Sequence, residues 1–305
     1  MPADIPVIGP EAEAALDWIA LTDAIAAGHD LPEAQTEDVF LTRGSDTILT
    51  RCAWIEGLGS LVKTATVFPG NATAGKPTIG GSVSLFGDTD GVLKAYLDFA
   101  LVTKWKTAAD SLLAARRLAR PDSRTILIVG AGTVGRSLRE AYAAAFPAAE
   151  FLVWNRTAET AKAFAAGFDK TEAVADLEEG VRKADIVTSA TMSVSPILKG
   201  EWFRPGQHVD LIGAYRADMR EADDALMTRG RIFVDSRATT IGHIGELKDP
   251  IARGVLTAVD VVSDYYTLNA FQRAPEDITV FKNGGGAHLD LMTSNYILET
   301  WKGRG

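Results

Sequence analysis

The chain has 305 residues, a formal net charge of −9, a pI of about 5.0 and one cysteine. The acidic balance argues against binding to nucleic-acid phosphates, and a single cysteine excludes an intrachain disulfide framework. No uninterrupted apolar run approaches the roughly 20 residues that a membrane helix needs. We therefore expect a cytoplasmic protein of about two domains that binds neither nucleic acid nor membranes.

The first 120 residues have the pattern of an antiparallel sheet with helices. Helical spacing covers residues 11–28, and an Ala-rich helix is expected at 103–119, where it ends before Pro121. Apolar runs separated by Gly-containing turns predict strands at residues 39–41, 48–54, 61–68, 83–86 and 92–101.

After Pro121, short apolar strands alternate with helices. The strands are predicted at residues 125–129, 151–154, 185–189, 208–212, 232–235 and 278–282. The helices are predicted at residues 134–145, 158–166 and 288–301. Unbroken apolar strands separated by helices indicate a parallel sheet covered on both faces. The predicted fold class is therefore α/β, with a doubly wound, Rossmann-type domain.

A glycine-rich turn joins the first of these strands to its helix. Gly130 makes the tight turn, Gly132 lets a pyrophosphate approach the backbone, and Gly135 lets helix and strand pack closely. Thr133 and Val134 open the helix, whose amides would face the phosphates. The alternative is a turn that merely connects strand to helix, but the strand-turn-helix context favours a dinucleotide site.

The end of the second parallel strand bears on the choice of cofactor. An NAD site usually has an acidic residue there for the ribose 2′-hydroxyl, whereas this chain has Asn155, Arg156 and Thr157. Because Arg156 can pair with a 2′-phosphate, the sequence favours NADP(H). The alternative is that Arg156 is a solvated loop residue and that NAD(H) also binds. Further candidate cofactor contacts follow a later strand: Ser189, Ala190 and Thr191.

Five segments in this order resemble the ornithine cyclodeaminase/μ-crystallin family. They are KTATVFPGN at 63–71, TKWKTAA at 103–109, GAGTVG at 130–135, GAYRADMRE at 213–221 and FKNGG at 281–285. The resemblance implies a Rossmann domain, residues 120–286, inserted into an α+β substrate-binding and dimerisation domain, residues 1–119 plus 287–305. It also implies a homodimer, and it brings Gly284 and Gly285 near the nicotinamide.

The resemblance further implies that a small amino or imino acid is held by its carboxylate. Arg43, Lys63 and Lys106 match the family's basic positions, and Thr107 follows at an apparent helix start. Lys106 replaces the usual arginine, which keeps the charge but loses the bidentate fork. Without the resemblance, Lys63 would be read as a solvent-facing strand residue and Thr107 as a helix cap.

Tyr215 distinguishes between the family's activities. Cyclodeaminases have a catalytic aspartate at this position, and ketimine reductases resembling μ-crystallin lack it. The sequence therefore favours reduction of Δ1-pyrroline-2-carboxylate or Δ1-piperideine-2-carboxylate to L-proline or L-pipecolate, with Tyr215 near the substrate. Lys63, or a water that it orients, is the expected proton donor. The alternatives are ornithine cyclodeamination, alanine dehydrogenation, or binding of NADPH and a small ligand without turnover.

The remaining candidate ligands predict no metal site. The four histidines, His29, His208, His243 and His288, are not expected to cluster, and no cysteine pair supports zinc. Cys52 lies in a largely apolar run and is expected to be a buried, inert thiol.

Overall fold

The computed structural model describes residues 5–303, and the chain divides into two compact units. The first unit comprises residues 1–106 and 286–305, and the second comprises residues 107–285. The division falls inside helix α2 (Phe99–Leu118), whereas the sequence analysis put the boundary at the end of that helix. The C-terminal helix belongs to the same unit as the N-terminal sheet.

A six-stranded sheet forms the first unit, in the order β1-β6-β5-β4-β3-β2. The strands are β1 (Val7–Ile8), β2 (Gln35–Arg43), β3 (Asp46–Ile55), β4 (Gly59–Val67), β5 (Ile79–Phe86) and β6 (Leu93–Asp98). The helices are α1 (Trp18–Gly28), α9 (Ala287–Lys302), the first half of α2, and the 3-10 helices η1 (Pro10–Ala15) and η2 (Pro69–Ala74). The strands from β2 to β6 pair antiparallel, as the sequence predicted, and only the short β1 pairs parallel, with β6.

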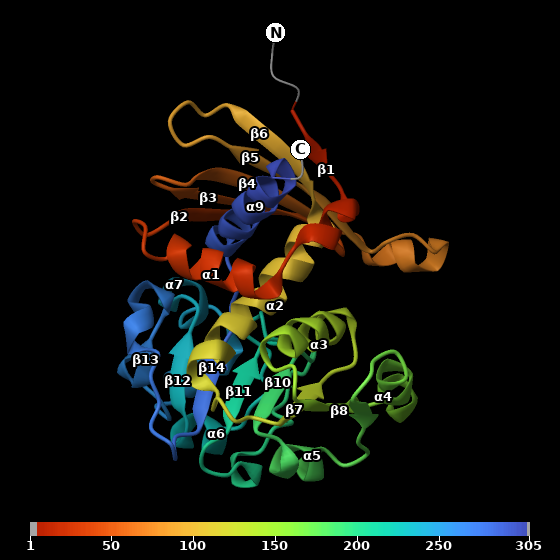
Figure 1. Ribbon diagram of the computed structural model, residues 1–305, viewed down its shortest axis with the longest axis vertical. Helices are drawn as coiled ribbons and strands as arrows, with labels where there is room; N and C mark the ends of the chain where they lie inside the picture. The colour runs from red at the N-terminus through yellow and green to blue at the C-terminus, as the bar shows by residue number, and fades with distance from the viewer. Residues whose placement is uncertain (1–4, 304–305) are drawn as a thin grey trace. The chain divides into compact units, whose positions relative to one another are not determined.

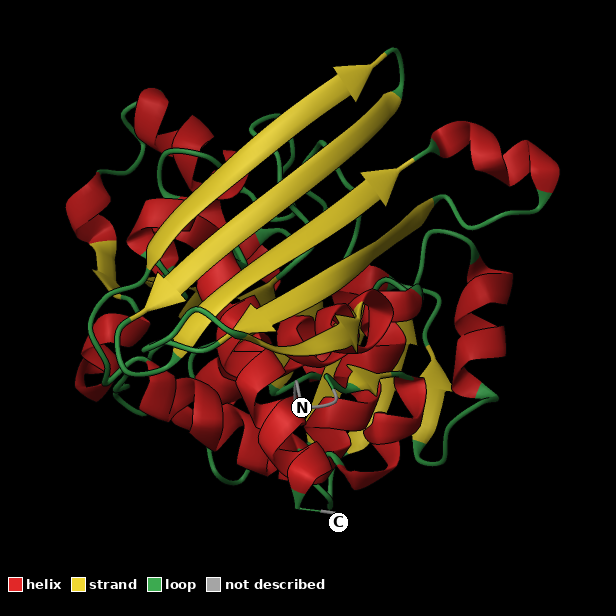
Figure 2. Cartoon of the chain, turned by 90° about the horizontal axis from the view of Figure 1, so that it is seen from above, coloured by secondary structure: helices red, strands yellow, loops and turns green. Residues whose placement is uncertain are grey.

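The two faces of this sheet differ because side chains alternate along each strand. Helix α9 packs along one face, against β2 to β5 (Figure 1). Ala53, Leu61 and Val83 are buried on the side covered by α9. Figure 2 shows the long strands of the opposite face uncovered by any helix, and Leu41 and Trp54 are exposed there. Within the described chain, this apolar face is left without a covering element.

The second unit is built on an eight-stranded sheet in the order β13-β12-β14-β11-β10-β7-β8-β9, with every pair parallel. Its strands are β7 (Thr125–Val129), β8 (Glu150–Trp154), β9 (Thr171–Ala173), β10 (Ile186–Ser189), β11 (His208–Leu211), β12 (Arg231–Val234), β13 (Val261–Ser263) and β14 (Thr279–Lys282). The chain runs outward from β7 through β8 to β9, then returns to β10 on the other side of β7. This reversal is the switch point of a doubly wound sheet, which confirms the predicted fold class.

Helices connect these parallel strands. They are α3 (Thr133–Ala145), α4 (Ala158–Ala165), α5 (Leu177–Lys183), α6 (Asp224–Arg229), α7 (Arg237–Thr240) and α8 (Gly245–Ala252), with the 3-10 helices η3 (Gly200–Trp202), η4 (Ala258–Asp260) and η5 (Tyr265–Ala270). Helices α5 to α8 were not predicted from the sequence. Each has at most eight residues, which is too few to display a clear apolar period. Among residues 5–303, no helix is long and apolar enough to cross a membrane.

Two predicted helix starts were wrong. The helix expected from residue 11 is divided, because α1 begins only after Asp17, whose carboxylate accepts the Ala20 amide (2.8 Å). Helix α2 begins after Asp98, whose carboxylate accepts the Leu101 amide (2.7 Å). In both cases an aspartate caps the first turn, a signal that the apolar spacing alone does not contain.

Candidate functional site

The glycine-rich turn lies at the switch point of the parallel sheet, directly after β7. A Cβ atom on Gly130 would lie 2.7 Å from the Ala190 carbonyl oxygen, and one on Gly135 would overlap the carbonyl of Gly130. Gly130 also has a φ of +110°, which favours glycine. A Cβ on Gly132 would meet nothing within 4 Å. Two glycines are therefore fixed by crowding, and the third leaves open space where a pyrophosphate would approach.

The side chain of Asn155, after β8, supports this turn. Its Oδ1 accepts the Ala131 amide (3.2 Å), and its Nδ2 donates to the Thr157 carbonyl (3.2 Å). Arg156 and Thr157 are exposed, and Arg156 has no hydrogen-bond or ion-pair partner among the residues that the structure describes. An unengaged guanidinium beside the turn suits an anionic group on the cofactor.

Two further predicted cofactor contacts are held by buried carboxylates. The hydroxyls of Ser189 and Thr191 donate to Glu221, so they are engaged within the protein. The amides of Gly284 and Gly285 donate to Oδ2 of Asp235 (2.9 and 2.5 Å). Both segments immediately follow parallel strands, at the edge of the sheet where ligands bind in this class of fold.

In the first unit, Lys63 forms a buried ion pair. Its Nζ donates to Oδ1 of Asp290 on α9 (2.8 Å) and to the Thr103 hydroxyl on α2 (2.8 Å). The side chains of Lys63 and Asp290 are 6% and 1% exposed. Lys106 is also buried, and its charge acts on both Lys63 and Asp290, which indicates that it lies near them. It has no hydrogen-bond or ion-pair partner in the described chain. The carboxylate of Asp290 therefore pairs with one ammonium group, and the charge of a second one acts on it without an ion pair.

The surroundings change the proton affinity of this pair. Burial disfavours the ammonium and lowers the pKa of Lys63, and Asp290 opposes the effect. Burial alone would raise the pKa of Asp290, but the charges of Lys63 and Lys106 outweigh it and the pKa is lowered. Asp290 is therefore ionised at neutral pH, and Lys63 is a stronger acid than an ordinary lysine.

Arg43 does not lie with these cations. It ends β2, its side chain is 82% exposed, and it pairs with Asp46 (3.1 Å). The strand register puts Arg43 on the uncovered face of the sheet, whereas Lys63 faces α9. Arg51 is instead the direct cross-strand neighbour of Lys63, and it pairs with Asp38 (2.8 Å). Arg51 was not predicted from the sequence. It could have been found, because residues on two paired strands that are about equally far from the connecting turn lie opposite each other on the same face.

Thr107 and Tyr215 also differ from expectation. Thr107 lies in the middle of α2 rather than at its start, and its carbonyl accepts from Nδ2 of Asn283 (3.1 Å). Tyr215 is 55% exposed in the loop after β11, beside the ion pair of Arg216 and Asp218 (2.8 Å).

Two of the histidines do meet. The rings of His29 and His288 pack edge to face, with centroids 5.4 Å apart, in the first unit. Burial lowers the pKa of His288 to about 3, so its imidazole is neutral. The expectation that the histidines stay apart was therefore wrong for this pair. In the part of the chain that the structure describes, no three side chains of His, Cys, Asp or Glu are arranged to hold a metal ion.

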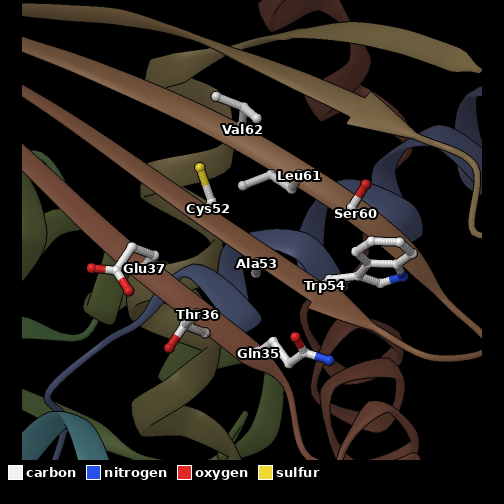
Figure 3. A pocket seen from close by; sticks show the side chains of 9 residues that line it. All are labelled: Gln35, Thr36, Glu37, Cys52, Ala53, Trp54, Ser60, Leu61 and Val62. Carbon is white, nitrogen blue, oxygen red and sulfur yellow. The ribbon is translucent and has the colours of Figure 1, made fainter. Parts of the chain in front are cut away.

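A shallow hollow of about 350 Å³ lies on β2, β3 and β4. Figure 3 labels its lining residues: Gln35, Thr36, Glu37, Cys52, Ala53, Trp54, Ser60, Leu61 and Val62. It has a carboxylate in Glu37 and no cationic side chain, so it does not suit an acidic ligand. Cys52, expected to be buried, is only half-buried there.

Known proteins match this chain in sequence and in fold. The sequence pattern of the ornithine cyclodeaminase/mu-crystallin family matches residues 56–305. A Δ1-pyrroline-2-carboxylate reductase from Paracoccus denitrificans is 54% identical over 302 residues, which is 96% of this chain and 96% of that protein. Ketimine reductase mu-crystallin of Mus musculus is 33% identical over 242 residues, which is 78% of this chain and 75% of that protein.

Among solved structures, Thermococcus litoralis Δ1-pyrroline-2-carboxylate reductase in complex with NADH and L-proline has a TM-score of 0.89. The match covers 99% of this chain and 98% of that one at 24% identity. At that identity, the likeness establishes a shared fold.

Proposed function

The chain belongs to the ornithine cyclodeaminase/mu-crystallin family, and from that premise we propose that it is a nicotinamide-dependent reductase of a cyclic ketimine. The substrate is Δ1-pyrroline-2-carboxylate, Δ1-piperideine-2-carboxylate or both, and the product is L-proline or L-pipecolate. The Paracoccus denitrificans relative supports the five-membered ring, and the mouse ketimine reductase supports the class of substrate.

The observation that carries this proposal is the charge imbalance around Lys63. Lys63 and Lys106 are both buried, but only Lys63 is paired with Asp290, while Arg51 is already paired with Asp38. A buried charge without a partner is costly, so this cluster favours a ligand that brings a carboxylate. A cyclic 2-imino acid has that group one bond from its C=N carbon.

The residues divide the chemical work as follows. Lys106 and Lys63 hold the substrate carboxylate, and Asp290 fixes the direction of the Lys63 side chain. Reduced nicotinamide, when bound, supplies a hydride to C2 of the imine. Lys63, or a water that it orients, gives a proton to the imine nitrogen, so one C=N bond becomes CH–NH. The lowered pKa of Lys63 favours this proton transfer.

Residues of the second unit account for the cofactor. The open space at Gly132 and the amides at the start of α3 fit a pyrophosphate. We further propose a preference for NADP(H), because Arg156 is exposed and unengaged and no acid stands at the end of β8. The solved Thermococcus litoralis structure contains NADH, so NAD(H) is the alternative cofactor to be compared.

The uncovered sheet face supports the family-implied homodimer. Val39, Leu41, Ile48, Trp54 and Tyr96 are exposed on or beside it, and large exposed apolar patches mark interaction surfaces. A second copy of this chain is the occupant we propose. We also retain the proposal that the protein is cytoplasmic.

The test measures NADPH and NADH oxidation with each cyclic imine, with pyruvate and ammonia, and with ornithine. Imine reduction without ammonia is expected. Ammonia-dependent use of pyruvate would instead identify an alanine dehydrogenase, and release of ammonia from ornithine a cyclodeaminase. Cofactor binding without any turnover would favour a binding protein. Lys63→Ala should abolish imine reduction and leave NADPH affinity within about twofold, because Lys63 lies outside the dinucleotide-binding unit.

A further inference from the structure

Glu221 lies fully buried in a hydrogen-bond network that joins the ends of two neighbouring strands. Its Oε1 accepts from the Ser189 hydroxyl (2.6 Å), the Thr191 amide (2.8 Å) and the Thr191 hydroxyl (2.7 Å). Its Oε2 accepts from the Gly213 amide (2.6 Å). Strand β10 ends at Ser189 and β11 at Leu211, so one carboxylate ties together the carboxyl ends of both strands.

The segments that Glu221 holds pack backbone to backbone, and one of them abuts the cofactor turn. The Ala190 carbonyl lies against Gly130, where a Cβ would approach to 2.7 Å. A Cβ on Gly213 would overlap the amide and carbonyl of Thr191 and lie 2.7 Å from Oε1 of Glu221. Because backbone atoms of these segments are in direct contact, a shift at Thr191 or Gly213 is transmitted to the turn.

A second buried carboxylate fixes the backbone of Glu221 itself. Glu246, in the first turn of α8, accepts the amides of Glu221 and Ala222 (both 2.9 Å). The ammonium of Lys282 is buried, donates to the Leu211 carbonyl (2.7 Å), and its charge interacts with both carboxylates. The backbone of Glu221 is therefore fixed by Glu246. Glu221 cannot follow a displacement of Thr191 or Gly213 without breaking its hydrogen bonds to Glu246.

We propose that Glu221 is a positioning residue for the dinucleotide: by receiving the amides of Thr191 and Gly213, it sets how the two strand-end segments lie against each other and how the segment at Ala190 lies against the cofactor turn. This inference rests on the proposed function, because it takes that turn to be the nicotinamide cofactor site. It adds a residue that acts on cofactor affinity through backbone amides rather than through contact with the ligand.

The proposal requires a carboxylate at this position. The hydroxyls of Ser189 and Thr191 can rotate to donate or accept, but the amides of Thr191 and Gly213 can only donate. These two amides point at different oxygens of Glu221. A glutamine side chain would accept one amide and present its own N–H to the other, which would push one segment away.

The experiment compares Glu221→Gln with a matched control, Asp185→Asn. Asp185 precedes β10 at its opposite end, and its carboxylate also receives four donors, from Arg120, Arg124, Thr125 and Arg204. Both variants lose acceptor capacity of the same kind, so both should lower the melting temperature. The dissociation constants of NADH and NADPH are measured by nicotinamide fluorescence in all three proteins. KM and kcat are measured with the imine.

Glu221→Gln should raise both dissociation constants at least about tenfold, the size of one lost hydrogen bond to a charged group. It should also raise KM for the cofactor more than KM for the imine, while Asp185→Asn leaves cofactor affinity within about twofold of the parent. Equal affinities in Glu221→Gln and the parent, or equal losses in the two variants, would overturn the inference and leave the proposed function standing. A parent protein that binds neither dinucleotide would instead overturn the proposed function.

Should Glu221→Gln fail to fold, Glu246→Gln takes its place, because it disturbs only the backbone of residues 221 and 222. Cofactor affinity weakened about threefold supports the inference, and unchanged affinity overturns it.

Discussion

The buried pair of Lys63 and Asp290 allows the cost of one substitution to be worked out. Asp290→Asn keeps the shape of the side chain but removes the charge that faces a lysine whose side chain is 6% exposed. Removing one partner of a buried ion pair costs about 3–5 kcal/mol, because the other charge is left uncompensated. The folding equilibrium should therefore move roughly 100- to 4,000-fold toward the unfolded chain, at about 1.4 kcal/mol per tenfold.

The cost should also depend on pH in a defined direction. Burial lowers the pKa of Lys63 below its ordinary value of 10.5, so between the folded and unfolded pKa values the unfolded chain binds more protons. Stability therefore rises with pH across that window. Asp290 raises the pKa of Lys63, so its loss extends the window to lower pH. The deficit of Asp290→Asn should be largest near neutrality and shrink toward about pH 10.

Urea unfolding at several pH values measures this cost. Near-UV circular dichroism of the stacked rings of Trp18 and Trp105, 3.8 Å apart, reports on the unit that contains the pair. The double variant Lys63→Met/Asp290→Leu should recover only part of the stability, since apolar side chains can replace the buried ion pair but the charge of Lys106 stays without Asp290. Asp218→Asn, which removes one partner of an exposed ion pair, is the control and should leave the free energy of unfolding nearly unchanged. A loss in Asp290→Asn below about 1 kcal/mol, or one that grows with pH, would refute the reasoning.

Three other predictions concern the cofactor, the assembly and the acid response. Arg156→Ala should raise KM for NADPH about tenfold or more and leave KM for NADH nearly unchanged in steady-state assays; equal effects on both would remove the argument for NADP(H). Val39→Lys/Leu41→Lys should convert a homodimer to a monomer in light scattering, because both side chains are exposed on the uncovered sheet face, and a variant that stays dimeric would exclude this face. Burial raises the pKa of Glu246 from 4.5 to about 7, so its contribution to stability is present below pH 4.5 and is lost as pH rises through about 7. Glu246→Gln should make the urea midpoint depend less on pH over that range. A pH dependence equal to that of the parent protein would contradict the raised pKa of Glu246.

Six of the eight strands of the parallel sheet were predicted because most of them are buried on both faces, whereas the three-residue strands β9 and β13 were missed. Strands buried on both faces are short, continuous apolar runs, and the one at Thr125–Val129 was predicted with its observed bounds. The glycine turn was also predictable, since crowding at Gly130 and Gly135 leaves no alternative residue. The apolar run and the glycine spacing are both local patterns, which a single chain displays directly.

The parts that escaped prediction depend on long-range pairing. Asp290 meets Lys63 across 227 positions, and Glu221 meets Ser189 across 32, so neither partner has a local signature. Arg43 was named because it matches a basic position of the family, and such a match does not reveal which face of the strand its side chain is on. A shift of one residue in register exchanges the two faces of a strand, and only the paired sheet fixes it.

Helix α2 constrains how the length of this chain can change. Its residues 99–106 belong to one unit and 107–118 to the other, so no flexible linker separates them there. One residue inserted in the middle of the helix would rotate everything beyond it by about 100° and advance it by about 1.5 Å. Either Lys106 would turn away from Asp290, or the carbonyl of Thr107 would turn away from Asn283. Insertions and deletions should therefore accumulate in the exposed connection between β4 and β5 and be absent from this helix, where they would break contacts within one unit or the other.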